Sequence, residues 1–159
     1  MASDYLLVLD GVTGESIDTT FAGAIEIQSF SWSVVNSGSS NVGTGAGVGK
    51  ASFNDMSFGT MVNKSTPKMI LNCALGTKVA TAVLHLRKQG DGQQEYLTYT
   101  LTDCVVSSVS HGGSGNGEVS ENFSLNYTKF EITYVPQKAD QSMDTAVSSG
   151  YDMKKTAKV

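Results

Sequence analysis

The side chains that could carry acid–base, nucleophilic or metal chemistry are few and scattered along the chain. It contains two histidines (His85 and His111), two cysteines and fifteen acidic residues. None of these residues cluster at the spacing of metal ligands, and no Gly-x-Ser-x-Gly segment is present to hold a nucleophilic serine. No pair of carboxylates is marked out for glycoside hydrolysis either. We therefore expect no enzyme activity, no metal and no cofactor.

Residues 37–50 form a Gly-rich segment that invites a phosphate-binding interpretation. A P-loop would need glycine where Thr44 stands, serine or threonine where Ala51 stands, and a helix afterwards, whereas the pattern that follows predicts a strand. The dinucleotide fingerprint fails as well, because it would need a third glycine at Lys50. Nucleotide binding is therefore not expected. The segment is instead predicted to be a long loop, of the kind that is functional or disordered.

Composition favours a single β-rich domain with a weakly charged surface. The chain has 159 residues and a formal charge of −4, and charged residues make up 16% of it, below the roughly 25% of an average protein. It contains 20 serines, 15 threonines and 17 glycines. The acidic balance argues against nucleic-acid binding. We expect one domain over residues 1–159, with a core at about 4–135 and a polar tail at 136–159.

Nothing in the sequence resembles a targeting or membrane segment. No stretch approaches the ~20 apolar residues that span a membrane, and residues 1–10 lack the basic start of a signal peptide. We expect the protein to fold in the cytoplasm without membrane insertion and, if it leaves the cell, to be exported folded. In such a reducing compartment Cys73 and Cys104 are expected to be free thiols rather than a disulfide, although the sequence leaves their redox state open.

Alternation of apolar and polar residues predicts strands along most of the chain. The apolar residues change face between Ile27 and Phe30, and a two-residue period can do so only with an extra residue. We therefore predict a β-bulge or sharp bend between Gln28 and Phe30. The polar stripe beside these aromatic residues consists of Ser29, Ser31 and Ser33. A second phase change, between Tyr127 and Phe130, predicts another bend in the strand expected at about 120–135.

One helix is predicted, at about residues 66–75. Pro67 suits its first turn, and Gly76 follows its last residue. Long strands bent by bulges are what a sheet needs to curl into a barrel. The expected fold is mainly β: a closed antiparallel β-barrel of bent strands with one short flanking α-helix and a long Gly-rich loop (37–50).

Several segments, taken in order, carry a family resemblance. They are Asp10-Gly-Val-Thr-Gly-Glu-Ser16, Phe30-Ser-Trp-Ser33, the Gly-rich loop through Lys50, Lys64-Ser-Thr-Pro-Lys68, Arg87-Lys-Gln-Gly90, Glu95-Tyr-Leu97, Val106-Ser-Ser-Val-Ser110 and Tyr134-Val-Pro-Gln-Lys-Ala-Asp140. Across about residues 4–141 the chain resembles the haemolysin-coregulated protein (Hcp) family, the tube subunits of bacterial type VI secretion systems. No single segment is diagnostic, but their ordered sum is highly specific.

The resemblance implies a structural protein without a catalytic site. A homohexamer would form a ring around a wide channel, and rings would stack into a tube inside a contractile sheath, capped by a spike protein (VgrG). Small effector proteins would sit in the lumen, making the subunit a conduit, carrier and chaperone. The protein would be cytoplasmic before firing and then be secreted through the type VI system to the extracellular space or a target cell. Which effectors bind, which cells are hit, whether rings stack head-to-tail or head-to-head, and where the tail docks stay open.

Two surface assignments follow as hypotheses. The polar stripe of Ser29, Ser31 and Ser33 would face the lumen and the effectors, because a conduit should not hold its cargo by large apolar patches. The Gly-rich loop would make the ring-to-ring contact, and its ordering cost would be met only on stacking. The loop residues assigned to stacking are Val42, Gly43, Thr44, Gly45, Gly47 and Val48.

Two other functions stay open at this point. The first is a tail-tube-like subunit of another contractile injection system, which would also be a ring of curved sheets. The second is a monomeric ligand-binding β-barrel or lectin, in which Trp32 and the tyrosines would stack on a sugar. Aromatic residues at alternating positions inside strands are more often core residues, and the native mass separates this second function from a ring.

Overall fold

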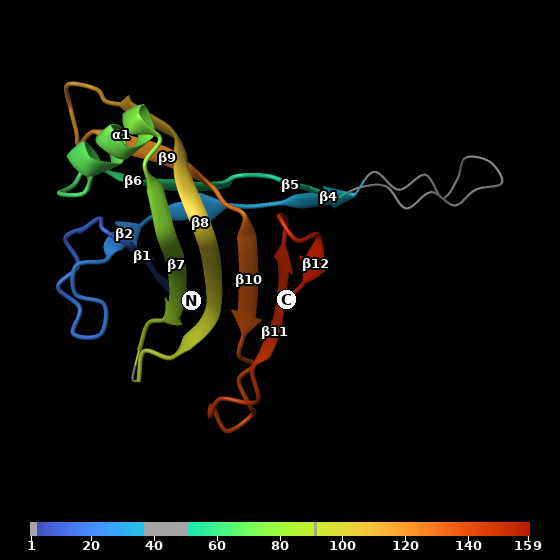
Figure 1. The fold of residues 1–159 in the computed structure, drawn as a ribbon. Coiled ribbons are helices and arrows are strands. Elements are labelled where there is room, and N and C mark those ends of the chain that lie inside the picture. The colour runs from blue at the N-terminus through green and yellow to red at the C-terminus, as the bar shows by residue number, and fades with distance from the viewer. Residues whose placement is uncertain (1–2, 37–50, 91) are drawn as a thin grey trace.

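The computed structural model describes residues 3–36, 51–90 and 92–159, and all but one of the regular elements in these ranges are strands (Figure 1). The strands are β1 (Ser3–Leu9), β2 (Ile25–Ile27), β3 (Ser29–Ser31), β4 (Val34–Asn36), β5 (Ala51–Phe53), β6 (Met56–Met61), β7 (Lys78–Lys88), β8 (Glu95–Gly112), β9 (Ser120–Asn126), β10 (Lys129–Tyr134), β11 (Val147–Asp152) and β12 (Ala157–Lys158). A single helix, α1 (Thr66–Leu75), stands among them. The expectation of a mainly β chain with one short helix at about 66–75 is confirmed. Within the described ranges, no helix has the length and apolar character needed to cross a membrane.

Ten of the strands form one antiparallel sheet, and β4 and β5 form a separate hairpin. The main path runs β12-β11-β10-β8-β7-β1-β2, and a branch runs from β8 through β9 and β6 to β3. The 18-residue β8 belongs to both parts, because its first half pairs with β7 and β10 and its second half with β9. Its register shifts between Val106 and Ser108. Such an irregularity bends a strand, so that one part of the sheet can fold over the other.

The bend predicted between Gln28 and Phe30 is confirmed. β2 ends at Ile27 and pairs with β1, whereas β3 begins at Ser29 and pairs with β6. The break at Gln28 lets Ile27 and Phe30, three residues apart, both pack on the core. The second predicted phase change also lies between two strands, because β9 ends at Asn126 and β10 begins at Lys129.

The core lies between the two parts of the sheet. Phe58 of β6 and Phe123 of β9 stack there with ring centroids 5.0 Å apart, and Met69 on α1 belongs to the same buried cluster. Trp32 is partly buried against this core, and its indole N–H donates to the hydroxyl of Tyr127. α1 contacts β8 and ends at Gly76, whose φ of 64° is the left-handed conformation that favours glycine.

The hydrogen-bonded strand order is an open path with β12 at one end and β2 at the other, so the closed barrel stays a prediction. Residues 136–159, expected to be a polar tail, contribute β11 and β12, which extend the sheet beyond β10. Figure 1 shows β12 on one side of the molecule and β2, with the loop before it, on the opposite side. The two flanks of the molecule, at β2 and at β12, are therefore formed by different parts of the sequence.

Candidate functional site

The polar stripe predicted from the sequence lies on β3 and just beyond it. Ser29 and Ser31 are exposed, while Phe30 between them is half-buried against the core. Ser33 follows the strand, is also exposed, and accepts a hydrogen bond of 2.7 Å from the side-chain amide of Asn54. Alternation in the sequence therefore separated the exposed side of this strand from its aromatic side correctly.

The sheet register places further small polar residues beside this stripe. One cross-strand row consists of Ser31, Ser57, Ser124 and Ser108. The neighbouring row consists of Ser29, Gly59, Asn122 and Ser110. We call these two rows the serine face, which spans β3, β6, β9 and the second half of β8.

Hydroxyl groups on and beside the serine face bond to one another. The Ser108 and Ser124 oxygens lie 2.6 Å apart, and the Ser124 oxygen is also 2.7 Å from that of Ser107. Ser107 in turn donates to Asp55 over 2.6 Å, and Asn126 donates to the same carboxylate over 2.9 Å. These bonds use part of the hydrogen-bonding capacity of Ser108 and Ser124 within the surface itself, which leaves those two hydroxyls less available to a passing molecule.

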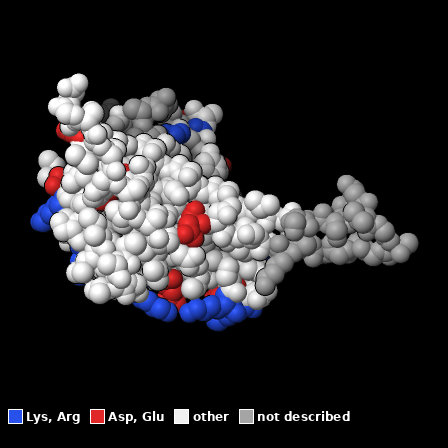
Figure 2. Space-filling model, turned by 90° about the horizontal axis from the view of Figure 1, so that it is seen from above, with Lys and Arg blue, Asp and Glu red and all other residues white. Residues whose placement is uncertain are grey.

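Gly59 has no side chain and so leaves a depression in the middle of the serine face. A Cβ atom at this position would lie 2.4 Å from the Ser29 hydroxyl oxygen and 3.3 Å from the Asn122 side-chain oxygen. The result is a shallow hollow, and none of the described residues that line it is charged. Seen from above in Figure 2, the side on which β6 and β9 lie is mostly free of charged side chains.

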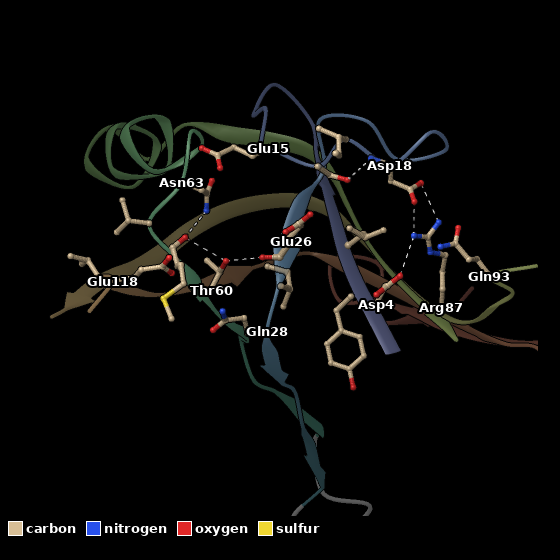
Figure 3. Close-up of a pocket in the computed structure, with 18 residues that line it drawn as sticks. Asp4, Glu15, Asp18, Glu26, Gln28, Thr60, Asn63, Arg87, Gln93 and Glu118 are labelled. Carbon is tan, nitrogen blue, oxygen red and sulfur yellow. Dashed lines mark hydrogen bonds and ion pairs between the residues drawn. The ribbon is translucent and has the colours of Figure 1, made fainter. Parts of the chain in front are cut away.

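A second hollow, beside β1, β2 and the end of β6, is acidic (Figure 3). This cavity of about 940 Å³, which we call the acidic groove, is lined by the carboxylates of Asp4, Glu15, Asp18, Glu26 and Glu118. Arg87 also lines it, and its guanidinium donates to both oxygens of Asp18, over 3.1 and 2.7 Å, and to Asp4 over 3.3 Å. The Arg87 hydrogen bond, more than any other contact, lowers the pKa of Asp18 from 3.8 to about 2.

Nothing in the sequence pointed to the acidic groove. Its carboxylates come from five separate positions between residues 4 and 118, with no common spacing. The register of β1 on β7 brings Asp4 opposite Arg87, and this pairing joins residues more than eighty positions apart. A signal of that kind exists only in the three-dimensional fold.

Neither histidine lies in a cluster suited to catalysis or metal binding. The His85 Nδ1 atom is 2.6 Å from Glu95, and the His111 Nε2 atom is 3.1 Å from Glu121, so each imidazole is held by one carboxylate on the neighbouring strand. Among the described residues, no group of three or more His, Cys, Asp or Glu side chains could hold a metal ion.

Both cysteines are free in the structure. Burial raises the pKa of the Cys104 thiol to about 12, which keeps it protonated and unreactive at neutral pH. The residues assigned to ring stacking, Val42, Gly43, Thr44, Gly45, Gly47 and Val48, lie outside the described residues.

Comparison with known proteins places this sheet arrangement in one family. The family described as Type VI secretion system effector, Hcp, matches residues 5–134. Protein hcp1 of Pseudomonas aeruginosa is 39% identical over 146 residues, which cover 91% of this chain and 90% of that protein. A solved structure of a type six secretion system protein matches with a TM-score of 0.94 and 25% identity, over 99% of this chain and 100% of that one. Hcp1 from Salmonella typhimurium matches with a TM-score of 0.83 and 29% identity, over the full length of both chains.

Proposed function

The chain belongs to the Hcp family of type VI secretion system proteins, and from this we propose that it is the subunit of the inner tube. Six copies would form a ring, and rings would stack into a tube that is ejected with effectors in its lumen. The tube would lie inside the contractile sheath and carry the spike protein VgrG at its tip. It would be built in the cytoplasm and leave the cell by the type VI route. The family is not one of known enzymes, in keeping with a structural role.

Closure of the sheet into a barrel belongs to the same proposal. Two hydrogen bonds support it by joining the β2 end of the main path to β6 of the branch. The backbone N–H of Gln28 donates to the carbonyl of Gly59 over 2.9 Å, and the Thr60 hydroxyl donates to the carbonyl of Glu26 over 2.7 Å. A closed sheet has fewer free edges and would suit a building block that must not pair at random.

The observation that carries the proposal is the serine face. Its two rows of small, uncharged side chains extend over four strands, and several of their hydroxyls are already bonded to one another or to neighbours. A lumen wall of this kind would let proteins of different charge lie against it and leave again, because it offers neither ion pairs nor large apolar contacts. We assign Ser29, Ser31 and Ser33 to the lumen on this ground, and the Gly-rich loop, with Val42 to Val48, to ring stacking.

The lumen assignment is tested by Ser31→Gln in the full-length chain. Ser31 is exposed at the β3 end of one serine row, so a longer side chain should project into the lumen. We expect rings of normal mass from which the co-purified effector is reduced several-fold. Ser148→Gln, an exposed serine on β11 outside the serine face, serves as the control and should keep its effector. Unchanged effector on intact Ser31→Gln rings would contradict the assignment.

A further inference from the structure

One apolar row of the main sheet runs out of the core onto the surface. Its members, in strand order from β2 to β11, are Ile27, Tyr5, Leu86, Leu97, Tyr134 and Val147. Directly paired residues of an antiparallel sheet point to the same face, so this row is continuous. Exposure rises from Leu86 toward β11: Leu86 is 2% exposed, whereas Tyr134 is 49% and Val147 64% exposed. The last two side chains present an apolar sheet face that continues the core without being covered.

A fully exposed apolar side chain stands on the opposite flank. Ile17, 94% exposed, belongs to the loop of residues 11–24 between β1 and β2, which we call the Ile17 loop. Single exposed apolar residues are common on protein surfaces. The backbone around Ile17, however, is held in place and has little freedom to fold this side chain back onto the protein. An exposed apolar side chain of this kind can anchor a contact by packing against an apolar surface of a partner.

The Ile17 loop is held in place on both sides of Ile17. Asp18 accepts hydrogen bonds from the backbone N–H groups of Thr20 and Phe21, over 2.9 and 3.1 Å, in addition to its two bonds from Arg87. The Phe21 ring stacks on His85 with centroids 4.3 Å apart. On the other side, the N–H of Ser16 donates to the carbonyl of Ala24 over 3.0 Å. A loop ordered in this way loses little further entropy when a partner covers its tip.

We propose that Ile17 of one copy packs on the exposed end of the apolar row, Tyr134 and Val147, of the next copy. The two surfaces lie near opposite ends of the strand order, β2 and β11, and on opposite sides of the molecule in Figure 1. One copy can therefore offer Ile17 to one neighbour and the apolar row to another. A repeated head-to-tail contact of this type closes into a ring when the rotation allows it. The contact rests on the proposed ring and names the surfaces that would hold it together.

The charges of the two flanks favour a head-to-tail contact with a second copy over a contact between two Ile17 loops. Residues 1–28 contain five acidic residues and no Lys or Arg, and Ile17 itself lines the acidic groove. The other flank is close to neutral: residues 129–159 contain five lysines and four acidic residues, and Lys154, Lys155 and Lys158 follow the end of β11 that is remote from Val147. Two acidic flanks repel each other, whereas the nearly neutral flank does not repel the acidic one, so charge disfavours a contact between two Ile17 loops and favours the head-to-tail orientation.

The experiment uses three full-length variants and their native masses. We expect Ile17→Asp and Val147→Asp each to weaken ring contacts about 100-fold or more, because a charge would be placed in an apolar contact. Each variant alone should run as a monomer of 16.8 kDa. Leu75→Asp, which changes a 69% exposed leucine on α1, is the matched control and should still form rings.

Mixing the two variants gives the decisive result. In the mixture, the intact apolar row of Ile17→Asp can receive the intact Ile17 of Val147→Asp, and no further copy can be added. We therefore expect a heterodimer of twice 16.8 kDa, about 34 kDa. Variants that still form rings, or monomeric variants whose mixture stays monomeric, would overturn the contact.

Two checks keep these outcomes separate from other failures. Circular dichroism and thermal unfolding must show that each variant is folded, and Ile17→Ser with Val147→Ser provides a milder pair if an aspartate disturbs its strand or loop. Wild-type rings beside unaffected variants would overturn the contact alone. A wild-type chain that is itself monomeric would overturn the proposed ring and the contact together.

Discussion

The serine face and the Ile17 loop are two exposed surfaces with opposite properties. The serine face is regular, uncharged and partly self-bonded, and it lies over a stacked aromatic core. The Ile17 loop is irregular and acidic, and it presents an apolar side chain that is 94% exposed. The first gives a molecule little to hold, whereas the second gives it an anchor. Exposure alone therefore does not identify an interface. The type of side chain that is exposed, and how rigidly the backbone holds it, also determine whether a surface can bind a partner.

The largest expected effect distinguishes the side of β9 that faces the core from the side that belongs to the serine face. Phe123 points into the core and is 2% exposed, while the neighbouring Ser124 points outward. Phe123→Ala should lower the free energy of unfolding by about 3–5 kcal/mol because it leaves a cavity beside Phe58. Ser124→Ala should change it by less than about 0.5 kcal/mol. Urea unfolding of both variants measures the difference, and equal losses would show that the serine row holds the fold as well as covering it.

An intermediate effect is expected at Gly14, where two stretches of the Ile17 loop backbone pack closely against each other. A Cβ atom on Gly14 would lie 2.5 Å from the carbonyl oxygen of Ala24. Gly14→Ala should therefore lower the free energy of unfolding by about 1–3 kcal/mol. Gly115, where an added Cβ meets no atom within 4 Å, is the control, and Gly115→Ala should unfold at nearly the wild-type urea concentration. A stable Gly14→Ala protein would mean that the loop yields at this point.

The smallest effect concerns the charge that holds the Ile17 loop. The pKa of Asp18 in the folded protein is about 2, whereas an unperturbed aspartate has a pKa of 3.8. Its carboxylate therefore stabilises the fold fully above about pH 4, and this contribution is lost as the pH falls toward 2. Asp18→Asn lacks the titrating group. Its free energy of unfolding should therefore fall less than that of the wild type between about pH 5 and about pH 2.5. Parallel curves for the two proteins would contradict the role given to the Arg87 contact.

The elements that depend on local pattern could be predicted from the sequence. The break at Gln28 followed from a change of parity, and α1 followed from Pro67 and Gly76. The polar stripe at Ser29 and Ser31 followed from alternation on one strand. These features are encoded by neighbours in the sequence, where a period of two or a helix-ending glycine is visible without the fold.

The features that depend on strand register could not be predicted. Ser57, Ser108 and Ser124 join Ser31 only because β6, β9 and β8 pair in one register. The exposed end of the apolar row is also a product of pairing, since Tyr134 meets Leu97 and Val147 across two strands. Ile17 gave no signal, because one apolar residue in a loop is common and its rigidity depends on the distant Arg87.

The native mass of the wild-type chain, measured by light scattering after size exclusion at micromolar concentration and physiological salt, tests the proposed ring most directly. A hexamer has six times 16.8 kDa, about 101 kDa, and we expect a single species of that mass. A stable monomer of 16.8 kDa would contradict the tube subunit and leave the serine face and the Ile17 loop without the roles given to them.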